Sequence, residues 1–164
     1  MISILKAIVS RLSSLPALGR ADIVISGKSG KIVLPVVPGD LPAVSNPQNN
    51  EVFKTVLGDI QIIGTLGLRE ISFDNFLAPA FPLKYSWANP MGASGMEIVK
   101  FFKQSQESYE PIRLTITHMN GSVYLNMACL IESFDFYTDN VKDVHYSAKF
   151  KEYRKENSTG GLVS

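Results

Sequence analysis

The sequence is poor in the residues that build redox and metal centres. Its 164 residues include one cysteine and two histidines. A single thiol excludes an internal disulfide, and two histidines far apart in the chain do not form a recognisable metal-ligand pattern. Cys129 lies in the apolar run 125–131, so we expect a buried, inert thiol. We expect His118, before a turn, and His145, in the polar phase of a strand, at the surface.

Net charge and long hydrophobic runs are also missing. Sixteen basic and fifteen acidic residues give a formal net charge of +1, which does not attract nucleic acid or an anionic membrane. No stretch approaches the roughly 20 apolar residues of a membrane span. Lys6 and Arg11 interrupt the apolar start of the chain, so export through a cleaved signal is not expected. We expect no nucleic-acid or membrane partner, and assembly in a reducing cytoplasm.

No spacing of residues indicates a catalytic centre. Glu132 and Asp135 lie three apart on an expected strand, which would place them on opposite faces. The other acidic residues in strand-like segments occupy polar phases and are expected to be solvated: Glu70, Asp74, Asp143 and Glu152. The Gly64–Gly67 run lacks the lysine and hydroxyl residue of a nucleotide loop. We therefore expect no catalytic, cofactor or metal residues and no enzyme.

Residues 2–15 show the periodicity of an amphipathic helix, which Pro16 and Gly19 would end. Its apolar stripe consists of Ile4, Leu5, Ile8, Leu12 and Leu15, with Val9 beside it. Two interpretations remain open. The helix packs on its own domain, or its stripe docks on another subunit. The second is favoured, because the helix lies outside the β-rich unit that follows.

From Ala21 the apolar period changes to two, which indicates β-strands. Four turns are expected, at residues 27–30, 58–59, 120–121 and 139–140. Residues 38–50 are expected to form a long ordered loop, and Phe81, Tyr85 and Trp87 lie in a second loop. These aromatic side chains would either cover the open end of the core or face a partner.

One internal helix is marked by Ser94 and Glu97, which have the spacing of a capping box. With about eight antiparallel strands, the pattern predicts an α+β fold, an antiparallel β-rich sandwich or split barrel with one flanking helix and an N-terminal helical extension. The expected organisation is a docking helix at 1–19, a β-rich domain at 20–154 and a disordered tail at 155–164.

Several phrases of the sequence resemble, in order, those of the XkdP-like tail proteins of PBSX-type prophages. They are Leu-Pro-Val-Val-Pro at 34–38, a Gly-x-Ile-x-Ile-x-Gly phrase at 58–64, Gly-Leu-Arg-Glu-Ile-Ser-Phe from 67, Pro-Ile-Arg at 111–113, and the Ile-Glu-Ser-Phe and Lys-Glu-Tyr-Arg phrases at 131–134 and 151–154. The matching positions include Leu34, Pro35, Gly67, Leu68, Ile71, Phe73, Phe76, Pro111, Phe134, Tyr153 and Arg154.

Members of that family are assigned to the baseplate of contractile tails. The resemblance implies a structural subunit of a phage tail or tailocin, assembled in the bacterial cytoplasm, that links the central hub and tube to the surrounding wedge proteins. It also implies about six copies in a ring, with head-to-tail contacts that close. Family members commonly continue into a peptidoglycan-binding LysM module, which does not follow here, so we expect no cell-wall binding by that route.

Three other functions remain as alternatives. A tube-initiating, tube-like subunit would also be antiparallel β with a flanking helix. A cell-wall hydrolase accessory of the tail would need two convergent carboxylates and would lose activity on replacement of Glu132. A nucleic-acid-binding accessory would use the basic residues near the C-terminus, with retention on DNA that weakens steeply with salt.

Deleting residues 1–15 is expected to leave the β-rich domain folded and to block incorporation into the tail particle. The reason is that the apolar stripe would be lost as a docking surface while the β core stays intact. Circular dichroism checks the fold, and electron microscopy of purified tails checks incorporation. Normal assembly of the truncated chain would contradict the docking interpretation.

Overall fold

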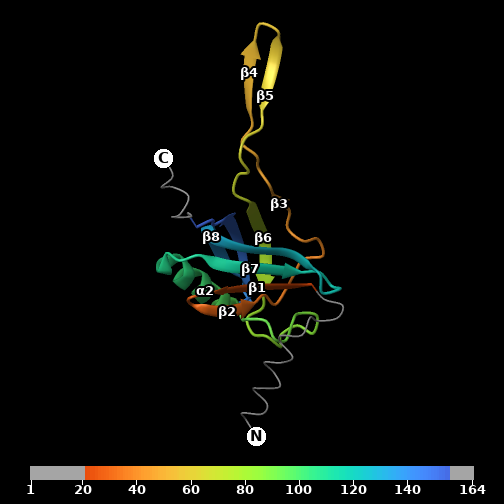
Figure 1. Cartoon of the computed structure of the whole chain (residues 1–164). Helices are drawn as coiled ribbons and strands as arrows, with labels where there is room; N and C mark the ends of the chain where they lie inside the picture. Colours follow the sequence, from red (N-terminus) through yellow and green to blue (C-terminus); the bar gives the residue numbers. More distant parts are fainter. Residues whose placement is uncertain (1–20, 156–164) are drawn as a thin grey trace.

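The computed structural model describes residues 21–155, in which nine strands and one helix form a body with a long projecting hairpin (Figure 1). The elements are β1 (Asp22–Gly27), β2 (Gly30–Val33), β3 (Val44–Ser45), β4 (Glu51–Thr55), β5 (Gly58–Ile62), β6 (Glu70–Ala78), α2 (Gly95–Ser108), β7 (Ile112–Thr117), β8 (Val123–Thr138) and β9 (Val144–Glu152). The predicted N-terminal helix, with its stripe Ile4, Leu5, Ile8, Leu12 and Leu15, and the predicted tail beyond residue 155 lie outside the described residues.

Seven strands form one antiparallel sheet in the order β2-β1-β7-β8-β9-β6-β3. Strands β4 and β5 pair only with each other, as a separate two-stranded sheet. The large sheet does not close, because its two ends are β2 and the two-residue strand β3. The predicted α+β class with an antiparallel sheet and one flanking helix is confirmed for residues 21–155, as a two-layer arrangement and not as a barrel.

Helix α2 covers one face of the sheet and begins at the predicted capping box. The Ser94 side chain accepts a hydrogen bond from the Glu97 N–H, and the Glu97 carboxylate accepts one from the Ser94 N–H. These two bonds satisfy N–H groups that have no partner inside the helix. The side chains buried against the sheet include Ile98, Val99, Phe101, Phe102 and Ser105. No helix within residues 21–155 has the length and apolar character that crossing a membrane requires.

Aromatic side chains fill the space between helix and sheet. Phe102 is fully buried, and its ring stacks on Phe134 of β8 with the ring centroids 4.5 Å apart. Its centroid also lies 5.9 Å from that of Phe150 and 6.1 Å from that of Tyr146, both on β9. Phe102 therefore joins α2 to the two central strands of this part of the sheet.

A bulge interrupts the second half of β8. The register shifts between Ile131, which pairs with Phe150, and Ser133, which pairs with Lys149. Glu132 is the extra residue. Beyond it the inward phase moves to Phe134, and β8 continues to Thr138, just before the turn predicted at residues 139–140. The bulge also removes the regular alternation from which Glu132 and Asp135 were predicted to lie on opposite faces.

Two local predictions were wrong, and a third needs an addition. The turn predicted at residues 58–59 is formed instead by Val56 and Leu57, because Thr55 pairs with Gly58, which has a φ of +124°. The strand predicted from residue 31 to 37 ends at Val33. The loop at residues 38–50 contains the short strand β3, which pairs with the first two residues of β6.

Replacing Phe102 with alanine is expected to lower the free energy of unfolding by about 3–5 kcal/mol, the usual cost of removing a buried phenylalanine ring. Phe136 lies next to Phe134 but is exposed, so Phe136→Ala is the matched control and should cost far less. Urea unfolding followed by circular dichroism measures both. Equal costs for the two variants would contradict the central role of Phe102.

Candidate assembly interface

The most exposed apolar surface of the described chain is the hairpin of β4 and β5 with its turn, residues 51–62, which we call the arm. All ten of its strand residues are exposed, and no other element pairs with it. The arm projects from the body as a long finger (Figure 1). An isolated two-stranded hairpin is at best marginally stable in water. Its apolar side chains therefore lack the burial that usually stabilises such a structure.

The apolar side chains of the arm lie mainly on one of its faces. Residues that pair directly across an antiparallel ladder share a face, so Phe53 and Ile60 lie together. Ile62, two residues further along β5, lies on the same face. Lys54 and Asp59 form a polar pair on the opposite face. The arm thus presents a one-sided apolar surface. No sheet or helix within residues 21–155 covers it.

The tip adds two more apolar side chains. Val56 and Leu57 form the turn, and both are fully exposed. Turns of this kind usually contain glycine, asparagine or aspartate, whose backbone and side-chain properties suit a solvated bend. The Val-Leu pair has neither property.

The arm leaves the body through a tightly built base. Asn49 donates a backbone hydrogen bond to Thr65 (2.9 Å), and Gly67 donates one to Pro47 (2.8 Å). A Cβ atom on Gly64 would lie 1.3 Å from the Asn49 carbonyl oxygen. The two chain segments approach so closely that only glycine fits at residue 64.

A cluster of charged side chains holds this base to the end of β9. Arg69 donates to Glu152 from its backbone N–H and its guanidinium, each at 3.0 Å. Arg154 donates to the carbonyl oxygens of Leu66 and Gly67, and to Glu152 at 3.0 Å. We call Arg69, Glu152 and Arg154 the clamp.

Glu152 is the centre of the clamp and was wrongly predicted to be solvated. Its side chain is 11% exposed. Burial alone would raise the pKa of its carboxyl, but the hydrogen bonds from Arg69 and Arg154 lower it to about 2. Two cations and a backbone N–H therefore keep the carboxylate charged. Glu152 is in strand phase with the buried Tyr146 and Phe150 and pairs with the buried Cys129, so its assignment to a polar phase was wrong. Contact with the arm base, at residues 66–69, completes its burial.

Asp143 is the second acidic residue that the structure buries against expectation. It is 2% exposed and accepts hydrogen bonds from Lys84 Nζ (2.7 Å), the Ala80 N–H (2.9 Å) and the Tyr85 hydroxyl. Burial opposes ionisation, yet the bonds from Lys84 and Tyr85 keep the pKa of Asp143 below its ordinary value. This buried carboxylate fixes the aromatic loop after β6 to the turn before β9.

The aromatic loop, which contains Phe81, Tyr85 and Trp87, leaves much of its aromatic surface exposed. Tyr85 stacks on Trp87 with ring centroids 4.9 Å apart. Phe81 and Trp87 are each more than half exposed. The loop therefore keeps aromatic surface in contact with solvent while its backbone is held in place.

The residues considered for catalysis lie apart from one another. Cys129 is fully buried, and burial raises the pKa of its thiol to about 12, so the predicted inert thiol is confirmed. His118 is exposed and packs edge-on against Tyr124. His145 is only partly exposed and bonds to Asp139 at 3.0 Å, which ties it to the turn between β8 and β9.

The carboxylates considered for hydrolysis are either exposed on the sheet or paired with cations. Glu132 and Asp135 are both exposed on β8. Within residues 21–155, no three or more histidine, cysteine, aspartate and glutamate side chains come together as a metal-binding group. Glu70 lies near Lys151 (3.4 Å) and Lys149 (4.0 Å), so it pairs with cations across the sheet.

The basic residues near the C-terminus do not form a continuous patch. Arg154 belongs to the clamp, Lys149 and Lys151 lie beside Glu70, and Tyr146 is buried in the core. Tyr146 is therefore not available for stacking on nucleic-acid bases. Tyr153 is exposed, and its N–H donates to Ala128.

The phrases that resemble the tail-protein family divide into a core set and an arm set. Ile71, Phe73 and Phe76 on β6 and Phe134 on β8 belong to the core or pack against it, and Leu34 and Pro35 are buried after β2. Pro111 is exposed before β7, and Leu68 is half-buried near the arm base. The phrase at 58–64 forms β5 and the return to the base, while Gly67, Tyr153 and Arg154 lie at or beside the clamp.

Comparison with known proteins gives a similarity without an assigned activity. No protein-family model matches the chain. It is 33% identical over 140 residues to YqbP, an uncharacterized protein of Bacillus subtilis strain 168. The alignment covers 79% of this chain and 58% of the relative, so the chain spans little more than half the relative's length.

The sequence pattern predicted a partner interface at residues 4–15 and did not indicate the arm. The signal that could have identified it is the turn at Val56-Leu57 together with the density of isoleucine, valine and phenylalanine around it. Alternation alone predicts a hairpin there. It does not distinguish a hairpin packed on a core from one that projects into solvent.

Replacing Glu152 with glutamine is expected to lower the free energy of unfolding by about 1–3 kcal/mol at neutral pH, as loss of charge-assisted hydrogen bonds does. Because the pKa of Glu152 is lowered to about 2 in the fold, its stabilisation is fully present above the unfolded pKa of about 4.3. It disappears as pH falls towards 2. Urea denaturation from pH 7 to pH 2 measures the difference between the variant and the native chain.

Glu132→Gln is the matched control, because Glu132 is an exposed carboxylate on the neighbouring strand. It should change stability by less than about 0.5 kcal/mol, as surface substitutions usually do. A difference for Glu152→Gln that did not shrink below pH 4 would show that the charge of Glu152 is not what holds the clamp.

Proposed function

We propose that this protein is a structural subunit of the baseplate of a contractile phage tail or tailocin. It would act by binding neighbouring copies and other baseplate proteins, not by catalysis. Its partners would be hub, tube and wedge subunits, which it would link in a ring of about six copies. The arm is the observation on which this proposal rests.

The arm exposes apolar surface that another chain could bury. In the free monomer Phe53, Ile60, Val56 and Leu57 remain exposed to water, so they contribute little hydrophobic stabilisation there. Monomeric soluble proteins rarely keep large contiguous apolar patches exposed, and such patches usually mark interaction sites. The close-packed base and the clamp present the arm from a fixed place, which reduces the entropy lost on binding.

The open sheet offers a second kind of contact. Strand β3 pairs with β6 only at Glu70 and Ile71, and β2 ends the sheet on the other side. A sheet edge presents backbone N–H and C=O groups to which another strand can bind. Subunits of a ring can use such edges for one another.

The resemblance to XkdP-like tail proteins supports the same function. Two of its phrases, at residues 58–64 and 67–76, form one strand of the arm, its base and β6. The Lys-Glu-Tyr-Arg phrase contains Glu152 and Arg154 of the clamp. If the arm has a role in assembly, we expect family phrases to coincide with the arm and with the clamp at its base.

A tube-like subunit that starts the tail tube would have a similar sheet and helix, and position in the particle separates the two functions. A cryo-electron microscopy map of the tail base would place a baseplate adapter outside the tube, as a ring. A tube-like subunit would instead stack along the tail axis.

Replacing the arm with a two-residue Asn-Gly turn between Asn50 and Ile63 is expected to leave the body folded and to abolish incorporation into tails. The two ends lie close together, because Gly64 donates to the Asn50 side chain at 2.9 Å, and Asn-Gly favours a tight hairpin. Circular dichroism and thermal unfolding check the body. Immunoblotting of purified tail particles checks incorporation.

The control variant combines Lys54→Gln and Asp59→Asn, which change only the polar pair of the arm. This variant should enter particles at the native level. Normal incorporation of the chain without its arm would contradict the proposal that the arm is the assembly contact.

A further inference from the structure

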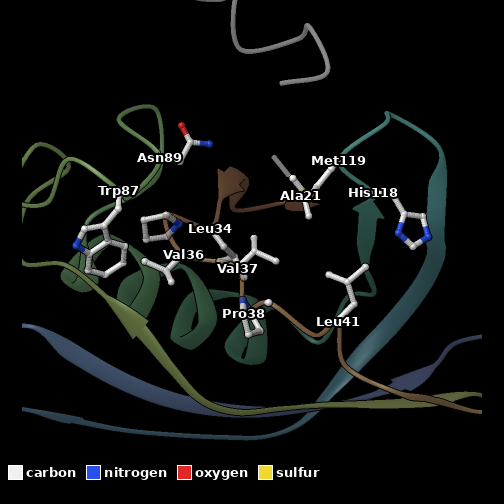
Figure 2. Close-up of a pocket in the computed structure, with 12 residues that line it drawn as sticks. Ala21, Leu34, Val36, Val37, Pro38, Leu41, Trp87, Asn89, His118 and Met119 are labelled. Atoms are coloured by element: carbon white, nitrogen blue, oxygen red, sulfur yellow. The ribbon is translucent and has the colours of Figure 1, made fainter. Parts of the chain in front are cut away.

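A second exposed apolar surface lies in the body and lines a hollow of about 330 Å³. The apolar side chains that line it include Leu34, Val36, Val37, Leu41, Trp87 and Met119. Trp87 lies at one end of the hollow, with His118 and Met119 at the other (Figure 2). Trp87 and Met119 are each more than half exposed, so the apolar lining is accessible from outside.

The walls of the hollow are held by backbone hydrogen bonds. Leu34 donates to Ile23 at 2.9 Å, and Asn89 donates to Pro35 at 2.8 Å. Trp87 is in turn positioned by its stacking on Tyr85. On the far wall, the Tyr124 hydroxyl donates to the Pro42 carbonyl at 2.8 Å. The hollow is therefore a preformed acceptor, and little ordering would be needed to bind into it.

The arm cannot fill the hollow of its own chain. Strand β6 separates them, because it begins beside the arm base at Glu70 and ends at Ala78, where the loop with Trp87 starts. Its nine residues span about 30 Å at about 3.3 Å per residue. The clamp fixes the base, and the arm points away from the body (Figure 1). Any arm in this hollow must come from another copy.

We propose that the tip of the arm, Val56 and Leu57, inserts into the hollow between Trp87 and Met119 of a second copy of this chain. The tip is narrow and aliphatic, and the hollow is apolar with an aromatic wall. The unusual Val-Leu turn then has a physical reason, since both side chains become buried in the complex. The inference rests on the proposed function of the arm as an assembly contact and names its partner.

The resulting contact is head-to-tail. Arm tip and hollow lie at opposite ends of β6. After the first contact forms, one copy therefore still has a free hollow and the other a free arm tip. Heterologous contacts of this kind give closed rings or open stacks, depending on the rotation between neighbours. A two-fold dimer would instead require the same surface on both copies.

Trp87 is the one tryptophan of the chain, so its fluorescence reports on the hollow directly. For the purified full-length chain, emission should shift to shorter wavelength and acrylamide quenching should decrease as concentration rises, in step with self-association in analytical ultracentrifugation. The double variant Val56→Asp, Leu57→Asp should lose both the shift and the self-association. It should still fold, because neither side chain packs on the core. The variant Lys54→Gln, Asp59→Asn should behave as the native chain does.

Disulfide trapping identifies the two contacting surfaces. A chain with Leu57→Cys mixed with a chain with Met119→Cys should give a disulfide-linked heterodimer under mild oxidation, whereas pairing with Glu132→Cys should give none. The native Cys129 is fully buried and stays silent. Because these assays use the purified chain alone, trapped dimers together with absence from tail particles would overturn the baseplate function and leave this inference standing.

Three results would overturn the inference. The first is a heterodimer yield no higher than that of the Glu132→Cys control. The second is trapping of Leu57→Cys mainly with itself, which would indicate arm-to-arm contact. The third concerns residues 1–20, which precede Ala21 at the rim of the hollow. If deletion of residues 1–15 alone exposed Trp87 further in the monomer, the occupant would be the chain's own N-terminal segment.

Discussion

The position of the arm depends on the carboxylate of Glu152. The strands of the arm pair only with each other, so the place of the arm relative to the body must be fixed at its base. There, Glu152 accepts hydrogen bonds from Arg69 and Arg154, and Arg154 reaches the carbonyl oxygens of Leu66 and Gly67. A charged group with this many donors keeps its charge although it is buried. The consequence is a projecting element with a defined origin.

The body and the arm are stabilised by different means. In the body, the rings of Phe102, Phe134 and Phe150 lie between helix and sheet, and burial of apolar surface dominates. In the arm, ladder hydrogen bonds and the close fit at Gly64 maintain the shape, while apolar side chains stay in water. This division suits a subunit in which the body folds alone and the arm completes its contacts on assembly.

Buried carboxylates anchor both surfaces proposed to meet in the assembly. Glu152 fixes the base of the arm. Asp143 fixes the loop that contains Trp87, through Lys84 and Tyr85. Neither carboxylate contacts the proposed partner, so each acts by holding a binding surface in place. Assembly through preformed surfaces loses less conformational entropy than assembly through segments that order on contact.

Local sequence patterns were sufficient to predict the class of the fold and the start of its helix. Period-two alternation from Ala21 indicated strands, and the structure buries Ile23, Ile25, Tyr146 and Phe150 on them; the Ser94–Glu97 spacing indicated the start of α2. These signals are local, since they depend on neighbours within a few residues. The bulge at Glu132 interrupts the alternation, and alternation alone did not predict it.

Which polar residues are buried and which apolar residues stay exposed depends on tertiary contacts. Asp143 and Glu152 are charged and were predicted to be solvated, yet segments from distant parts of the chain cover them. Phe53 and Ile60 alternate like core residues, yet 49% and 55% of their surface stays exposed. Alternation specifies that two faces differ. Which face is covered depends on segments far away in the sequence, and for the arm we infer that it depends on another chain.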